Sequence, residues 1–212
     1  MTWFNTLFMR IYFVRHGESR DGQANIFQSG TTPLSEKGSE QARIVAKRFL
    51  NIPIDAIIAS DYERAHQTAK EIANILKKEL TMTELARERN APSEIYGKSV
   101  HDSEAKAIQN IANKNFSNPD FHYSDEENFL DLKTRAIKLV GYLKNRPEEN
   151  LLVVLHGTIL RCVIALMMFG EELTPDTFSH FSFFFLENTG VTVCDWKNGA
   201  WKLITWNDQS HL

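Results

Sequence analysis

The sequence is poor in cysteine and in charge of one sign, and both shortages narrow the classes of protein to consider. Its 212 residues contain two cysteines, Cys162 and Cys194, which form no CxxC pair and are too few for a disulfide framework. Such a pair is typical of small buried side chains in a reducing compartment, so we expect a cytoplasmic protein. The first ten residues, "MTWFNTLFMR", also lack the basic region and the long apolar stretch of a signal peptide.

Charge and hydropathy exclude further classes. The 24 Lys and Arg against 27 Asp and Glu give a net charge of −3, and no basic tract is present, which argues against nucleic acid or an anionic membrane as a partner. A local pocket can still bind a small anion. One apolar run, residues 151–169, is nearly long enough to cross a bilayer, but His156, Gly157, Thr158 and Arg161 interrupt it. A buried strand followed by a buried helix explains this run better.

Strands alternate with helices over the first two thirds of the chain. Apolar runs predict strands at residues 8–14, 54–59, 80–86 and 150–156, and stripes of helical period predict helices at 33–50, 60–78, 126–145 and 158–169. Ser35 is the expected N-cap of the first helix, and Ser60 with Glu63 forms a capping-box pattern for the second. The alternation predicts an α/β fold, layered helix–sheet–helix, with a mostly parallel central sheet.

Two regions depart from this alternation. Residues 87–124 lose periodicity apart from a helical piece at 103–113, and we interpret them as a small insertion or lid over the C-terminal ends of the strands, within a single domain of residues 1–212. Residues 181–206 predict successive strands with turns at 188–190 and 198–199, and we expect the phenylalanine run at 178–185 to lie in the core.

Four cationic or imidazole side chains follow the predicted strands. Arg15 and His16 end the first strand, Arg64 lies in the first turn of the helix after the second, and His156 ends the central strand. Because the carboxyl ends of parallel strands share one edge of a sheet, we expect these four side chains to meet there. The alternative without a functional role is that each arginine forms a surface ion pair, with Glu18 or Asp61 as the partner.

Such a cluster suits a phosphate ester. Two guanidinium groups at one place repel each other unless an anion lies between them, and their planar forks match phosphate oxygens. A neutral imidazole can attack phosphorus as a covalent nucleophile, and a second imidazole can donate to the charge on the equatorial oxygens. A metal site built on the two histidines is disfavoured, because the neighbouring arginines repel cations.

The same segments resemble a known family. "VRHGES" resembles the signature of the histidine phosphatase superfamily, the phosphoglycerate mutase-like family, and "TPLSEKGSEQA" resembles its "LTxxGxxQA" segment. "IIASDYERAHQTA" and "VVLHG" resemble its second-arginine and second-histidine segments. Any one of these motifs is weak, whereas four in the family's order over nearly the whole chain are highly specific.

The resemblance implies roles for individual residues. His16 would be the nucleophile that becomes phosphohistidine, and Arg15, Arg64 and His156 would bind the phosphoryl group. Glu88 is the best match to the family's acid, which protonates the leaving oxygen, and its rivals are Glu84 and Glu94. The chemistry would need no metal and no cofactor, because the arginines supply the positive charge.

The sequence also departs from the family's pattern. The polar residue that helps to hold phosphate soon after RHG is replaced by the loop "ESRDGQANIFQSG", where Asn25 is our candidate at a longer spacing and Ser19 is another. The Trp-Asn pair and the longer basic insertion of the true mutases are not seen. We therefore expect hydrolysis of a small-molecule or protein phosphomonoester, with inorganic phosphate as product. Mutase-type phosphoryl transfer and a non-catalytic phospho-ligand binding protein remain the alternatives.

Overall fold

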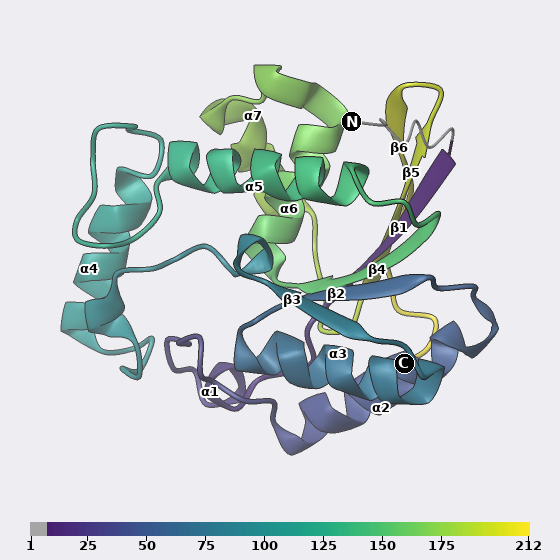
Figure 1. Cartoon of the computed structure of the whole chain (residues 1–212). Coiled ribbons are helices and arrows are strands. Elements are labelled where there is room, and N and C mark those ends of the chain that lie inside the picture. The colour runs from purple at the N-terminus through teal and green to yellow at the C-terminus, as the bar shows by residue number, and fades with distance from the viewer. Residues whose placement is uncertain (1–7) are drawn as a thin grey trace.

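The computed structural model describes residues 8–212 and contains a six-stranded sheet in the order β3-β2-β4-β1-β5-β6 (Figure 1). The strands are β1 (Phe8–Arg15), β2 (Ala56–Ser60), β3 (Leu80–Thr83), β4 (Asn150–Leu155), β5 (Val191–Lys197) and β6 (Ala200–Asp208). The first four pair in parallel, while β5 is antiparallel to both β1 and β6. The predicted mostly parallel α/β sheet is confirmed.

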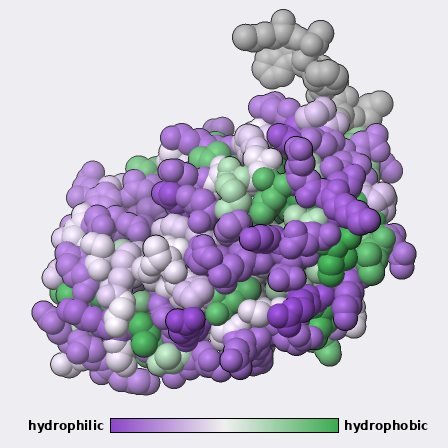
Figure 2. Space-filling model, turned by 60° about the horizontal axis from the view of Figure 1, so that its bottom comes forward, coloured by the Kyte–Doolittle hydropathy of each residue, from purple (hydrophilic) through white to green (hydrophobic). Residues whose placement is uncertain are grey.

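Helices cover both faces of this sheet, which confirms the helix–sheet–helix layering. In Figure 1, α2 (Glu36–Arg48) and α3 (Glu63–Leu76) lie below the sheet, and α5 (Phe129–Lys144) and α6 (Gly157–Phe169) lie above it. The face turned toward the viewer in Figure 2 is the underside of Figure 1. It is largely hydrophilic, with hydrophobic side chains in small separate patches, as expected for the solvent side of amphipathic helices.

The central strand β4 shows why its sequence is an unbroken apolar run. The side chains of Leu151, Val153 and Leu155 pack between the sheet and the helices α5 and α6. Those of Leu152 and Val154 pack between the sheet and the helices α2 and α3. Successive side chains of a strand point to opposite faces, so a strand covered on both faces is apolar at every position. Within residues 8–212 no helix is both long and apolar enough to cross a membrane.

Most helix starts follow the capping rules, and α3 and α6 are the α-helices of residues 8–212 that lack a side-chain cap bond. Ser35 caps α2 and accepts a hydrogen bond from the backbone N–H of Gly38, as predicted. The capping box predicted from Ser60 and Glu63 is wrong: Tyr62 is the N-cap of α3, and it makes no side-chain cap bond. Ser60 is instead the last residue of β2, where its backbone remains in the strand ladder, and its hydroxyl is bonded to His156, which follows β4.

The connection from β3 to α5 holds the helix α4 (Ser103–Lys114), close to the predicted 103–113. The predicted third strand ends early, and Glu84–Ala86 forms a 3₁₀ turn. The connection joins the loop after β1, because residues 25–27 and 97–100 exchange backbone hydrogen bonds, among them Phe27 N–H to Lys98 O at 2.9 Å. The loop after β1 and the irregular connection from β3 to α5 are therefore held together by backbone hydrogen bonds.

The phenylalanine run is where the fold differs most from expectation. It forms no strand: α7 (Pro175–Ser179) is followed by a 3₁₀ turn at His180–Phe183. Phe178 and Phe181 are buried as expected, because a spacing of three puts both on one side of a helical turn. Phe183 and Phe185 are instead 84% and 66% exposed. The later strands β5 and β6 are confirmed, with a tight turn at residues 198–199, both at positive φ.

Candidate active site

The ends of three parallel strands bring the predicted polar side chains together at one edge of the sheet. Arg15 is the last residue of β1 and His16 follows it, and His156 follows β4 as the N-cap of α6. The two imidazole rings lie 4.9 Å apart between centroids. Arg64, in the first turn of α3, reaches His16 at 3.2 Å. Four positions that are distant in sequence thus lie around one point, as topology predicted.

His16 is held as a neutral imidazole with a defined tautomer. Its ring is buried, and Nδ1 lies 2.7 Å from the carbonyl oxygen of Gly17, so Nδ1 carries the proton and donates it. The lone pair is then on Nε2, which accepts a hydrogen bond from Nε of Arg64. Burial lowers the pKa of His16 well below its usual value, and the charges of Arg64 and Arg15 lower it further.

His156 is fully buried beside His16. Its Nε2 lies 2.9 Å from the hydroxyl of Ser60, and its Nδ1 has no hydrogen-bond partner among residues 8–212. The ring of Tyr62 packs edge-on against it, at 5.4 Å between centroids. Burial, followed by the charge of Arg64, lowers the pKa of His156 well below its usual value. Sequence reasoning missed Ser60 because it assigned that hydroxyl to a helix cap.

Arg64 is buried and Arg15 is half-buried, and neither forms an ion pair with an acidic side chain of residues 8–212. Nη1 of Arg15 donates to the carbonyl of Leu186 at 2.5 Å, and its Nε is buried with no partner among the described residues. Nη1 of Arg64 donates to the carbonyl of Ser29 at 2.8 Å. Burial lowers the pKa of both groups, because it removes the charged guanidinium from water.

Arg15 and Arg64 do not form the alternative surface ion pairs with Glu18 or Asp61. Glu18 pairs with Lys37, and Asp61 pairs with Arg87, so neither acid is bonded to the arginines of the cluster. Their guanidinium groups instead bond to backbone carbonyls, which leaves part of each donor set free.

Glycines permit the close packing that sets this geometry. A Cβ on Gly38 would lie 1.9 Å from the carbonyl oxygen of Glu18, and one on Gly17 would lie 2.5 Å from the carbonyl oxygen of Gly38. The N-terminus of α2 therefore rests directly on the loop that carries His16. Gln41 completes the contact, because its side-chain oxygen accepts from the backbone N–H of Glu18 at 2.8 Å. The glycine and glutamine of "SEKGSEQA" are thus explained by packing on the RHG loop.

Of the three candidate acids, Glu88 is the one that lines the cavity of His16. Its carboxylate accepts from the backbone N–H groups of Arg89, Thr158 and Ile159 at 2.8 to 3.1 Å. The last two belong to the first turn of α6, where the positive end of the helix dipole favours a carboxylate. Glu84 lies outside and pairs with Arg87, and Glu94 is exposed and bonded to Ser124.

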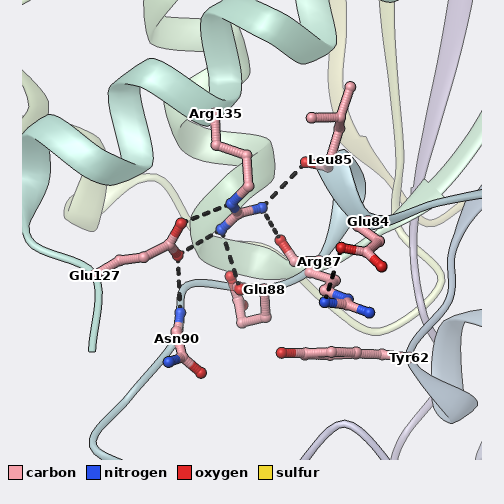
Figure 3. A pocket seen from close by; sticks show the side chains of 8 residues that line it. All are labelled: Tyr62, Glu84, Leu85, Arg87, Glu88, Asn90, Glu127 and Arg135. Atoms are coloured by element: carbon pink, nitrogen blue, oxygen red, sulfur yellow. Dashed lines mark hydrogen bonds and ion pairs between the residues drawn. The ribbon is translucent and has the colours of Figure 1, made fainter. Parts of the chain in front are cut away.

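A partly buried ion pair holds the backbone on both sides of Glu88 (Figure 3). Arg135 on α5 donates two bonds to the carboxylate of Glu127, at 2.7 and 2.6 Å, and also bonds to the carbonyls of Leu85, Arg87 and Glu88. The same Glu127 carboxylate accepts from the backbone N–H of Asn90 at 2.9 Å. We call Arg135 and Glu127 the clamp. Sequence reasoning missed it, because these residues lie about 40 to 50 positions from the loop they hold.

The cavity at this edge has a volume of about 170 Å³. It is lined by Arg15, His16, Gln28, Tyr62, Arg64, Glu88, Arg89, Ala91 and Tyr96. Asn25, predicted to hold phosphate, is not among them: it is exposed, at positive φ, and its carbonyl accepts from Val100. Gln28 lines the cavity instead and is bonded to Ser19, which caps α1 (Arg20–Gln23). The path of the loop after RHG therefore brings Gln28, three positions after Asn25, to the cavity.

Within the part of the chain that the structure describes, no cluster of three or more His, Cys, Asp or Glu side chains has the arrangement of a metal site. The paired histidines have bonds to Gly17, Arg64 and Ser60. The arrangement is best suited to bind an oxyanion, because the guanidinium groups of Arg15 and Arg64 provide its hydrogen-bond donors.

Comparisons with known proteins agree with this geometry. The family model described as "Histidine phosphatase superfamily (branch 1)" matches residues 11–209. "Putative phosphoserine phosphatase 2" of Hydrogenobacter thermophilus is 32% identical over 163 residues, which cover 74% of this chain and 78% of that protein. "Probable phosphoglycerate mutase GpmB" of Enterobacter sp. is 27% identical over 213 residues, covering 96% and 95%. The solved structure "Bacillus stearothermophilus YhfR" is 27% identical, covers 96% of this chain and 98% of that one, and superposes with a TM-score of 0.81. The chain belongs to the histidine phosphatase superfamily.

Proposed function

We propose that the protein hydrolyses phosphomonoesters through a phosphohistidine formed on His16. The observation that carries this proposal is the state of His16, a buried neutral imidazole whose unprotonated Nε2 faces a guanidinium group that can also bind phosphate oxygens. A protonated or surface histidine would lack the lone pair or the low-dielectric surroundings that make an imidazole a useful nucleophile.

In the first step, the ester phosphate docks between the arginine forks, beside Arg15 Nε and His156 Nδ1, two buried nitrogens that have no partner among residues 8–212. Nε2 of His16 attacks phosphorus in line as the P–O ester bond breaks. Glu88, protonated for this step, gives its proton to the leaving alkoxide. The charge that spreads over the equatorial oxygens meets preorganised donors, which lowers the barrier.

In the second step, Glu88 acts as a base. Its carboxylate takes a proton from a water molecule, the resulting oxygen nucleophile attacks phosphorus, and the P–N bond breaks. Inorganic phosphate and the neutral imidazole are released. The arginines supply the positive charge that a metal ion supplies in other phosphatases, so we propose that the reaction needs no metal.

The relatives support hydrolysis of small phosphorylated substrates. One is named for phosphoserine and another for phosphoglycerate, and both names refer to phosphate esters of small carboxylic acids. The second name also keeps mutase-type transfer as the competing reaction. The products distinguish the two: hydrolysis releases inorganic phosphate, whereas a mutase returns an isomeric ester.

The test is to trap the intermediate. Protein mixed with a ³²P-labelled phosphoester and quenched in alkali, in which P–N bonds survive, is expected to carry label, and His16→Ala should carry none. His66→Ala is the matched control, because His66 is a partly exposed histidine of α3 that pairs with Glu63. Label that persists on His16→Ala would refute the assignment of the nucleophile.

A further inference from the structure

A second cavity, of about 380 Å³, lies beside the catalytic one. It is formed by the end of α4, the first turn of α6 and the α7 region, and its walls include Arg89, Phe116, Ser117, Arg161, Phe178 and Ser182. Among residues 8–212, no acidic side chain lines it. Its volume is within the range of pockets that bind small organic molecules.

The two cavities adjoin each other. Arg89 lines both, and Thr158 in the second cavity donates its backbone N–H to Glu88 in the first. The space beside Gly157 marks the junction. A Cβ at that position would lie 3.5 Å from Nη1 of Arg161 and 3.8 Å from both Nε of Arg15 and Oε2 of Glu88. A group bound in the second cavity would therefore be within a few bonds of a phosphoryl group on Arg15.

The charge of the second cavity is unbalanced. Nη2 of Arg89 is buried without a hydrogen-bond partner among residues 8–212. Arg161 donates from Nε to the carbonyl of Phe184 at 3.1 Å, and Arg89 donates to the carbonyl of Glu127 and the side chain of Asn113, so neither arginine forms an ion pair with a carboxylate in the described part of the chain. Burial lowers the pKa of both guanidinium groups. An anion between them would offset that cost.

Two phenylalanines form the apolar part of the cavity, beside the neutral polar side chains of Asn113, Ser117, Thr158, Ser179 and Ser182. Phe116 and Phe178 face each other at 6.2 Å between centroids, and the guanidinium of Arg89 lies 4.2 Å from the centroid of Phe116. Aromatic walls bind flat or apolar groups by burial, and arginine heads bind carboxylates through paired hydrogen bonds. The combination selects a ligand with one negative charge on an apolar body.

We propose that this cavity binds the alcohol portion of the substrate, and that Arg161 determines specificity by binding a carboxylate on an aromatic or otherwise apolar scaffold. The proposal rests on the proposed hydrolase function, because the alcohol must extend from the phosphoryl site. A carboxylate fits better than a second phosphate, since the nearby carboxylate of Glu88 would repel a dianion more strongly than a monoanion.

The test compares 4-(carboxymethyl)benzyl phosphate with its carboxamide, 4-(carbamoylmethyl)benzyl phosphate. These esters have the same shape, and the methylene group insulates the leaving oxygen from the substituent. We expect kcat/KM to favour the carboxylate by at least about tenfold, as for a hydrogen bond between charged groups. In Arg161→Gln this ratio should fall to within about threefold of one, whatever happens to the two absolute rates, and Arg161→Lys should give an intermediate ratio.

Arg43→Gln is the matched control, because Arg43 lies on α2 and its partner Glu40 is on the same exposed turn. It should keep the full ratio. A ratio near one in the unaltered protein, or an unchanged ratio in Arg161→Gln, overturns the proposal even if both esters are hydrolysed. The thermal midpoint of each variant is measured alongside, so that loss of the fold is not mistaken for loss of the ratio.

A binding measurement separates this proposal from the proposed function. The corresponding phosphonates have a C–P bond in place of the ester and cannot be hydrolysed. In calorimetry the carboxylate phosphonate should bind at least about tenfold more tightly than its carboxamide, and Arg161→Gln should remove the difference. Equal affinities, or no binding of either, overturn the cavity assignment. Selective binding without any release of phosphate from the esters would refute hydrolysis and leave the binding site supported.

Discussion

The clamp is the part of the molecule whose removal tests the assignment of Glu88 most directly. Arg135→Met keeps much of the length of the side chain and removes all five hydrogen bonds of the guanidinium, including those to the carbonyls of Leu85, Arg87 and Glu88. It also leaves Glu127 without its cation. The loop that carries Glu88 then loses its attachment to α5, while Arg15 and Arg64 are untouched.

The structure sets the size of the effect on stability. Breaking a buried ion pair by removing one partner costs about 3–5 kcal/mol. Each clamp side chain keeps 17% of its surface exposed, so solvent offsets part of this cost. We expect a loss of about 2–4 kcal/mol in the free energy of unfolding, which lowers the thermal midpoint of a chain of this size by about 5–15 °C.

The effect on turnover has a different signature. A displacement of about 1 Å at a reacting group can cost about a hundredfold in rate, so we expect Arg135→Met to lower kcat by about that factor with little change in KM. Arg135→Lys, which keeps the charge but not the fork, should recover part of both quantities.

The assays are urea unfolding and steady-state hydrolysis of an aryl phosphate below the midpoint of each variant. Arg43→Met is the control: its partner Glu40 and Arg43 itself are each more than half exposed, and such pairs contribute about 0–1 kcal/mol. A destabilised Arg135→Met that keeps the full kcat would refute the positioning of Glu88 by the clamp.

Two further predictions follow from burial and packing. His16 and His156 have lowered pKa values in the folded state, so unfolding takes up protons once the pH falls below about 6.5. The free energy of unfolding is therefore fully present above that pH. Below it, the free energy of unfolding should decline by up to about 2.7 kcal/mol per pH unit. Urea titrations from pH 7.5 to 5 check this, and His16→Gln should have a clearly smaller slope. Gly38→Ala places a Cβ 1.9 Å from the carbonyl of Glu18 and should destabilise by several kcal/mol, about 3 or more, whereas Gly141→Ala, in open space within α5, should stabilise by about 0.5–1 kcal/mol. Equal thermal midpoints for these two variants would contradict the packing argument.

The convergence of the site could be predicted because it depends on topology rather than on side-chain detail. Arg15, His16 and His156 stand directly after apolar runs, and parallel strands bring such positions to one edge of the sheet. The layered architecture followed from the same alternation of strands and helices. Local periodicity and the positions of strand ends were therefore sufficient for the fold class and for the four side chains that meet at this edge of the sheet.

The remaining parts depend on contacts that leave no local pattern. Ser60 has the spacing of a helix cap, but its hydroxyl bonds to His156, which is 96 positions away. The clamp is made of two charged residues that are ordinary in an amphipathic helix and the loop before it. Asn25 was chosen by distance from RHG, and the actual path of the loop brings Gln28 to the cavity instead. Each of these outcomes was decided by tertiary packing.

Glu88 lies on a loop, yet its carboxylate is hydrogen-bonded to the first turn of the helix that has His156 as its N-cap. Movement of the loop during entry of an ester would have to break several N–H bonds before the distance from this acid to the second imidazole changed. The groups proposed to react are in this way bonded to α6, whereas α4 and α7 contribute walls to the cavity proposed for the departing alcohol and none to the cavity of His16. Sequence change in those two helices can alter which ester is accepted without disturbing the chemistry.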